Sequence, residues 1–282
     1  MIDYITRKKE SGGNIRGGAF HSIRGGRTSI DDMLSAKYNN GQSEFSANVR
    51  FIQRKGDWTR EYDEKFFFPD HVLHRQEIGE PTLFNKKVLY SNLNYSLQEK
   101  DKYIFNAQFR YSFNDFPAGY EDRKSKLYSS GSETPLSIYD HTVEKNRIPA
   151  LDLYFQRNLR NDQSLIFNLV GTYIRTENTR IYQETRENDL ETDILSDISG
   201  KKYSLIAEGI YEKRIGKSQF TGGLKHTQSY TDNTYTGTTV TDVSMKQSES
   251  FAYAEYLLKT GKWSYMANLA FSRFYYSQRN NK

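Results

Sequence analysis

The feature that most constrains this chain is an alternation of apolar and polar residues with a period of two. It is clearest in the segment YIFNAQFRYS at 103–112 and recurs along most of the chain. Successive side chains of a β-strand point to opposite faces, so each such segment is a strand with one apolar and one polar face. The apolar face is rich in aromatics, and the polar face carries Asn, Gln and Arg. The pattern predicts an all-β chain built on one amphipathic antiparallel sheet.

Short polar turns and long polar connections alternate between these strands. The short turns lie at 39–41, 99–101, 160–162, 215–217 and 260–262, and the long connections at 54–82, 115–145, 176–198 and 230–246. One end of the sheet therefore carries tight turns and the other carries long loops. We predict eleven strands, at 14–24, 29–38, 42–53, 83–97, 102–114, 147–158, 163–175, 200–213, 218–229, 248–258 and 262–275.

This layout is typical of a transmembrane β-barrel, which has short turns on one side of the membrane and longer loops on the other. Only 36% of the residues are hydrophobic, but 22 are Tyr, a residue that suits the membrane–water interface. No apolar run approaches the roughly 18–20 residues of a spanning helix. We therefore expect an antiparallel transmembrane barrel whose apolar face contacts lipid and whose polar face lines a lumen. Alternate residues of each strand are assigned to lipid, including Phe45, Ala47, Leu93, Leu153, Leu169, Ala207, Leu224, Ala252, Leu269 and Phe271.

Particular residues follow from this interpretation. A membrane girdle of aromatics is expected close to the short turns, at Tyr103, Tyr203, Trp263 and Tyr265. The side chains that face the lumen, or a plug within it, are Asn48, Arg50, Asn106, Gln108, Arg110, Glu208 and Glu255. The two arginines contact a plug or pair with Glu208, Glu212 or Glu255, and we favour the pairing.

Eleven is an odd number of strands, whereas bacterial single-chain barrels have an even number. An open sheet edge cannot lie in hydrocarbon, because its N–H and C=O groups find no water there. Eleven is also half of 22, the strand number of plugged outer-membrane transporters. We therefore predict that residues 11–282 form part of a barrel, about one half of it.

Several functions are disfavoured by composition. The chain has no Cys, which excludes disulfides and thiolate sites, and its charge of +5 is scattered without a basic cluster, which argues against nucleic acid. His71 and His74 lie in a long connection without a metal-ligand scaffold, and His226 and Ser229 share one strand without forming a triad. We predict no enzyme activity, no metal and no cofactor.

Aromatic residues in the long connections are the best ligand-contact candidates. Aromatic faces beside charged groups suit stacking on sugars or on the planar groups of chelates. The alternative is that these rings pack the loops against one another and against the rim of the barrel. The candidates are Trp58, Tyr62, Phe66, Phe67, Phe68, Phe116, Tyr120, Tyr128 and Tyr139.

Two segments carry a resemblance to a known family. MIDYITRK at 1–8 is similar to the end of the plug domain of TonB-dependent outer-membrane receptors, and FAYAEY at 251–256 followed by KWSY at 262–265 resembles a hairpin near the middle of the large barrels of the Bacteroides group. The resemblance implies that residues 1–10 are the remnant of a plug. It also implies uptake of a scarce large solute, such as an iron chelate, a cobamide or a glycan. The implied partners are outer-membrane lipid, a plug domain, the other half of the barrel, the TonB complex and a surface lipoprotein.

Two other interpretations remain open at this point. One is a complete smaller barrel of 10 or 12 strands with an adhesive or structural role, and the other is a soluble β-rich glycan-binding module. The segment at 1–10 contains no apolar export signal. An outer-membrane location therefore requires that a signal is supplied from outside this segment.

Overall fold

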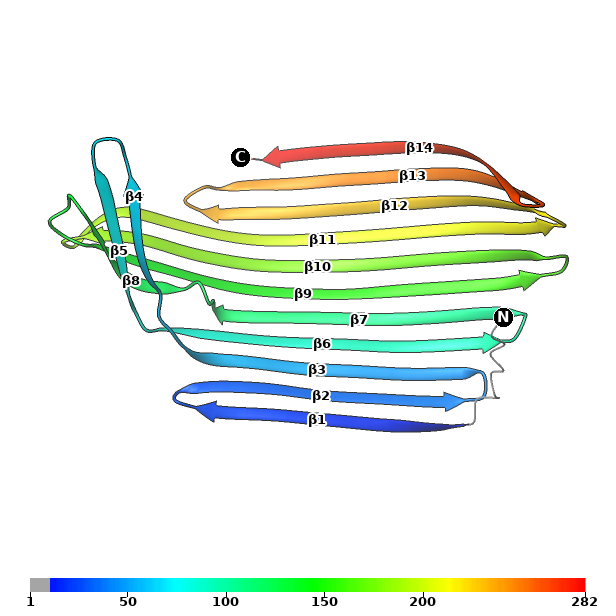
Figure 1. Cartoon of the computed structure of the whole chain (residues 1–282), viewed down its shortest axis with the longest axis horizontal. Coiled ribbons are helices and arrows are strands. Elements are labelled where there is room, and N and C mark those ends of the chain that lie inside the picture. Colours follow the sequence, from blue (N-terminus) through cyan, green and yellow to red (C-terminus); the bar gives the residue numbers. More distant parts are fainter. Residues whose placement is uncertain (1–10, 282) are drawn as a thin grey trace.

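The computed structural model describes residues 11–281, and in this part of the chain every regular element is a β-strand. Eleven long strands run side by side as a meander (Figure 1). They are β1 (Gly12–Arg24), β2 (Arg27–Asn40), β3 (Ser43–Trp58), β6 (Thr82–Glu99), β7 (Tyr103–Ala118), β9 (Leu136–Leu159), β10 (Gln163–Arg186), β11 (Asp189–Ile215), β12 (Ser218–Gly237), β13 (Thr241–Thr260) and β14 (Trp263–Asn281). All neighbours are antiparallel. The predicted antiparallel β-fold and its eleven-strand meander are confirmed. Among residues 11–281, no helix is long and apolar enough to span a membrane.

The five predicted short turns join strands at one end of the sheet. Gly41, Gly216 and Gly261 have φ values of 59°, 58° and 58°, and Asp101 and Asn161 have 62° and 60°. A positive φ is favourable for Gly and is tolerated by Asn and Asp, so these residue types fix the tight reversal. The register within each of these hairpins is therefore set locally by its turn.

The prediction that the four long connections are loops is wrong, because most of their residues form strands. Segments 176–198 and 230–246 continue β10–β11 and β12–β13 as strands, so that β11 reaches 27 residues. Their polar side chains pair across strands, as when Thr179 Oγ1 donates to Asp197 Oδ1 at 2.8 Å and Gln183 Nε2 donates to Asp193 Oδ1 at 3.1 Å. Both faces are polar here, so hydrophobic alternation ends although the ladder continues.

Segments 54–82 and 115–145 contain three further strands, β4 (Glu61–Phe67), β5 (Val72–Glu80) and β8 (Arg123–Ser129). They pair in the order β4-β5-β8-β9, and β9 joins through Leu136–Asp140. The β3–β6 and β7–β9 hairpins thus continue into these strands past a bend, which lies where Trp58, Thr82 and Asp122 meet. We call β4, β5 and β8 the extension; β4 and β5 rise steeply across the ends of the long strands (Figure 1).

The main sheet is a single layer without a hydrophobic core. The buried apolar residues of the described chain are only Phe84, Val88, Ala118, Ile138 and Ala150. The accessible surface is 19895 Å² for 33.0 kDa, against roughly 12,500 Å² for a folded soluble monomer of that mass. A sheet of this kind normally needs a second layer on its apolar face. Both faces are uncovered, and the sheet is not closed, because β1 and β14 each pair on one side only.

The strand register places the predicted apolar residues on one face, which we call the apolar face. One row of directly opposed residues runs Phe45, Tyr95, Ala107, Leu153, Leu169, Ala207, His226, Ser250 and Arg273. Because side chains alternate along each strand, the residues between these positions form the polar face. The apolar face is well exposed, with Phe45 at 49%, Phe167 at 50% and Leu269 at 77%. Residues 1–10, predicted as a plug remnant, lie outside the described residues.

Candidate functional site

The seven residues predicted to face a lumen all lie on the polar face. Arg50 donates to both carboxylate oxygens of Asp31 at 2.8 and 2.7 Å, and Arg110 Nη2 donates to Asp152 Oδ2 at 2.5 Å. The expected pairing with Glu208, Glu212 or Glu255 is wrong. Each arginine instead pairs diagonally with the adjacent strand, where long side chains of one face meet.

The rest of the polar face is linked by short hydrogen bonds between neighbouring strands. Gln108 Nε2 donates to Asn92 Oδ1 at 3.0 Å, and Asn168 Nδ2 donates to Glu208 Oε2 at 2.9 Å. These groups lie at the surface, so water competes for the same bonds and each pair contributes only modestly. The polar face is therefore a hydrated surface with self-paired charges.

Tyrosines of the apolar face form two bands at different distances from the short turns. Tyr103, Trp263 and Tyr265 lie within a few residues of a short turn, as predicted, together with Tyr95, Tyr211 and Tyr256. The prediction that Tyr203 lies close to a short turn is wrong. It lies on the same face but far along β11 from its short turn at 215–217, directly opposite Tyr173 and Tyr230, and its ring centroid is 4.8 Å from that of Tyr173. Tyr111, Tyr173, Tyr203, Tyr230 and Tyr275 form this second band.

Apolar residues fill the space between the two bands, and they include Phe105, Phe109 and Phe167 besides small and aliphatic side chains. On β11 the residues of the apolar face between Tyr203 and Tyr211 are Leu205, Ala207 and Gly209. Eight residues separate the two tyrosines on this strand, as they separate Tyr103 from Tyr111. At about 3.3 Å per residue, the bands are roughly 26 Å apart along a strand.

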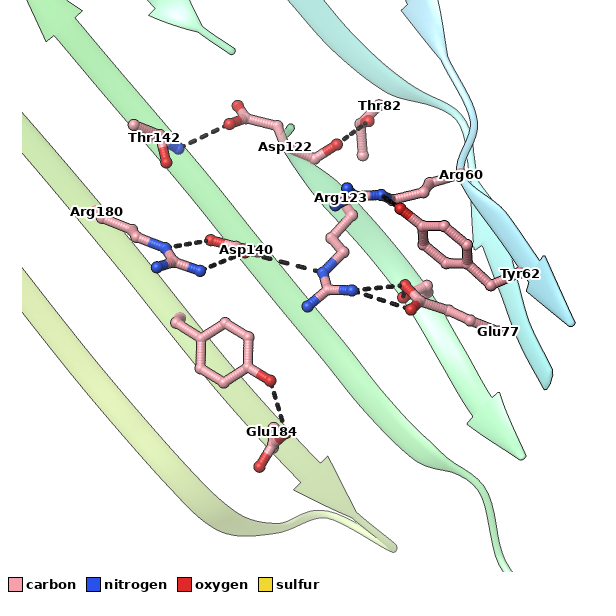
Figure 2. Close-up of polar contacts among 12 residues, drawn as sticks. Arg60, Tyr62, Glu77, Thr82, Asp122, Arg123, Asp140, Thr142, Arg180 and Glu184 are labelled. Carbon is pink, nitrogen blue, oxygen red and sulfur yellow. Dashed lines mark hydrogen bonds and ion pairs between the residues drawn. The ribbon is translucent and has the colours of Figure 1, made fainter. Parts of the chain in front are cut away.

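A buried ionic network attaches the extension to the sheet (Figure 2). Arg123 Nη1 on β8 donates to both oxygens of Glu77 on β5 at 3.1 and 2.9 Å, and Ser125 Oγ donates to Glu77 at 2.6 Å. Asp140 on β9 lies 3.8 Å from Arg123 Nε and accepts two bonds from Arg180 on β10 at 2.9 and 2.8 Å. Glu77 and Asp140 are each 7% exposed. The network crosses four strands and occupies the polar face of the sheet.

Asp122 forms a second attachment point at the bend. Its side chain accepts bonds from His141 Nδ1 at 2.5 Å and from the Thr142 backbone N–H at 2.7 Å. Its carbonyl oxygen accepts a bond from Thr82 Oγ1 at 2.9 Å. Asp122 is 4% exposed, so these bonds compensate the loss of its hydration. The turn after β7 is thereby fixed to the start of β6 and to β9.

Tyr182 extends the network on β10. Burial, followed by its hydrogen bond to Glu184, raises the pKa of the Tyr182 hydroxyl to about 12. The bonds that Glu184 accepts from Tyr182 and Thr192 lower the pKa of the Glu184 carboxyl. The guanidinium of Arg180 lies 5.5 Å from the Tyr182 ring centroid. This part of the polar face is therefore a neutral phenol and a carboxylate held between arginines.

Two of the predicted ligand aromatics meet at the bend. Trp58 and Tyr120 lie 6.4 Å apart edge to face, and Tyr120 stacks on Phe84 with the centroids 4.4 Å apart. Trp58 and Tyr120 remain 45% and 43% exposed. Tyr62 accepts a hydrogen bond from Arg60 nearby. The bend thus presents a partly exposed aromatic cluster beside charged groups.

The other predicted aromatics are dispersed. Phe66, Phe67 and Phe68 lie at the tip of the β4–β5 hairpin, where Phe67 is 78% exposed and Phe68 stacks on His71. Phe116 lies under Lys86, whose Nζ is 4.6 Å from the ring centroid. Tyr128 and Tyr139 project from the opposite face of the extension to Glu77 and Asp140. The nine aromatics therefore do not form one site.

The sequence interpretation missed the buried network. Its residues, Glu77, Arg123, Asp140, Arg180 and Glu184, all lie in segments predicted to be long polar connections. The contacts of Arg123, Ser125 and Asp140 join residues 17 to 48 positions apart, so no fixed spacing in the sequence marks them.

The imidazoles of His71, His74 and His226 each contact one polar side chain. His71 and His74 contact Asp70 and Asp63, each at 2.7 Å, and His226 Nδ1 lies 2.9 Å from Ser250 Oγ. Within residues 11–281, no three His, Asp or Glu side chains are grouped so that they could hold a metal ion. No protein-family model, curated protein or solved structure matches this chain.

Proposed function

We propose that this chain forms part of the wall of an outer-membrane β-barrel, and that the barrel is a transporter of the TonB-dependent receptor type. The observation that carries the proposal is the exposed apolar face with its two tyrosine bands. Outer-membrane barrels have an outward apolar belt about 25 Å tall between two aromatic girdles. Lipid would replace the second layer that a soluble sheet of this size requires.

The inclination of the strands supports the same proposal. The row of opposed residues passes through Phe45, four residues after Gly41, and through Arg273, twelve residues after Gly261. Across eight strand-to-strand steps, the distance of the row from the short turns thus increases by eight residues. This is about one residue, or 3.3 Å along the strand, for each 4.8 Å across the sheet. If the short turns share one plane, the strands tilt by roughly 35°, within the range of barrels. The two bands then lie roughly 22 Å apart along the membrane normal.

A half-barrel explains the open edges. Strands β1 and β14 would pair with the remainder of the barrel, because unpaired backbone groups are not tolerated in hydrocarbon. The hydrated polar face, with Arg50 and Arg110 already paired, would surround a plug domain. The extension would then project on the outer side, opposite the short turns.

The same arrangement supports a role in transport. The aromatic cluster of Trp58, Phe84 and Tyr120 and the exposed tip at Phe66–Phe68 would meet a large solute, such as an iron chelate, a cobamide or a glycan. The buried network under the extension would hold these rings at a fixed height above the lumen. A TonB complex and a surface lipoprotein are the partners that such a transporter requires or uses.

The two tryptophans provide a direct test of the membrane assignment. Trp263 lies in the band near the short turns, whereas Trp58 lies at the bend. In vesicles that contain brominated lipid, a W58F variant, which retains only Trp263, should be strongly quenched. A W263F variant, which retains only Trp58, should be quenched by aqueous iodide instead. A chain that stays monomeric without detergent, with Trp263 inaccessible to both quenchers, would refute the proposal.

A further inference from the structure

The apolar face is interrupted by polar residues on its last three strands. His226 on β12, Ser250 on β13 and Arg273 on β14 are directly opposed in one row. They lie on the same face as Leu224, Ala252 and Phe271, two residues away on the same strands. All three polar side chains are exposed. The other residues of the same row, from Phe45 to Ala207, are apolar or aromatic. These three polar side chains therefore require a polar partner on this face.

The row presents positive charge without an internal counter-ion. His226 Nδ1 lies 2.9 Å from Ser250 Oγ, which leaves Nε2 directed to other partners. Arg273 makes no side-chain hydrogen bond or ion pair with any residue of the described chain. Lys246 lies on the same face of β13, with its ammonium 5.9 Å from the Tyr230 ring centroid. The acid nearest along β12, Asp232, accepts a hydrogen bond from Ser244.

An apolar groove lies directly beside this charge. Its volume is about 890 Å³, and its lining combines the polar row with an apolar floor. Small residues on neighbouring strands, Ala207, Gly209 and Ala252, leave the space between larger side chains open. The apolar lining also includes Leu169, Leu224 and Phe271. A single extended alkyl chain fits such a groove.

The level of the row matches the membrane interface. On β12 and β14 the next apolar-face positions beyond the row lead to the second tyrosine band, at Tyr230 and Tyr275. The groove runs from the row toward the short turns, into the apolar belt. A lipid headgroup would thus contact the charged row at the membrane interface, and its acyl chain would lie in the groove within the apolar belt.

We propose that this surface is a specific site for an anionic phospholipid, whose headgroup phosphate carries a net negative charge that no cationic headgroup group neutralises. Arg273 and His226 contact the phosphate, with Ser250 between them, and an acyl chain occupies the groove over Ala252. Guanidinium groups bind phosphate through paired N–H donors, and they gain most when water is partly excluded. The inference rests on the proposed function, because it requires the apolar face to meet lipid.

The test compares two lipids with identical acyl chains on the full chain in detergent. Native mass spectrometry measures retention of dioleoyl phosphatidylglycerol, dioleoyl phosphatidylcholine and inorganic phosphate. Arg273→Gln should weaken phosphatidylglycerol binding about tenfold or more and leave phosphatidylcholine unchanged. The matched control is Arg157→Gln, an exposed arginine on the same face near a short turn, which should change neither.

A second variant separates the tail from the head. Ala252→Phe fills the groove and should also weaken phosphatidylglycerol, while inorganic phosphate alone should not bind at concentrations that saturate the lipid site. Equal affinity of the wild type for both lipids, or equal effects of the two arginine variants, would overturn the site while leaving membrane insertion intact. A chain that retains neither lipid and is monomeric without detergent would overturn the proposed function itself.

Discussion

Arg123→Ala tests whether the ionic network attaches the extension to the sheet. The substitution removes both bonds to Glu77, which is 7% exposed, and leaves the carboxylate with only the Ser125 hydroxyl. Removing one partner of a buried ion pair costs about 3–5 kcal/mol. The remaining Ser125 bond places the effect near the lower limit, about 3 kcal/mol. Asp140 keeps its two bonds from Arg180, so the loss concerns the extension alone.

Amide hydrogen exchange measures this loss directly. A change of about 3 kcal/mol in local opening accelerates exchange roughly 100-fold in β5 and β8, with β12 and β13 unaffected. Arg110→Ala is the control, because its guanidinium is 53% exposed and such pairs contribute about 0–1 kcal/mol. The double variant Glu77→Gln/Arg123→Ala should recover much of the protection, since no charge is then left buried. Unchanged exchange in β5 and β8 of Arg123→Ala would refute the attachment.

Three further outcomes are expected. Because the pKa of Tyr182 is raised from 10.0 to about 12, its contribution to stability is complete below pH 10 and is lost as the pH rises to 12. In a spectrophotometric pH titration, Tyr182→Phe should remove the tyrosinate absorbance step that occurs at the highest pH. Gly79→Ala would place a Cβ 2.2 Å from the Arg60 carbonyl oxygen, which should make the β4–β5 hairpin sensitive to protease. Leu169→Arg on the apolar face should destabilise vesicle-inserted protein by about 2–4 kcal/mol in urea, whereas Asn168→Arg should be close to neutral.

The alternation of apolar and polar residues correctly predicted most of the main sheet. It did not predict the parts of the strands in which both faces become polar. On β10 it predicts residues 163–175, which end just past Tyr173, while the strand continues to Arg186. Beyond Tyr173 most opposed side chains are polar and are linked by hydrogen bonds and ion pairs, with isolated apolar pairs such as Ile181 and Leu195. A period-two signal of hydrophobicity cannot report such a ladder. The contacts of Arg123 and Asp140 were inaccessible for the related reason that they join residues far apart in sequence.

Register is a different problem from strand location, and the tyrosines contain part of its solution. A slip of one residue between β10 and β11 would exchange the apolar and polar faces, so alternation alone excludes it. A slip of two residues keeps the faces but would set Tyr173 opposite Leu205 or Lys201. In the observed register Tyr173, Tyr203 and Tyr230 are directly opposed on three consecutive strands. Aligning tyrosines between the predicted strands 163–175 and 200–213 would therefore have fixed the pairing of Tyr173 with Tyr203, whereas Tyr230 lies just beyond the predicted strand 218–229.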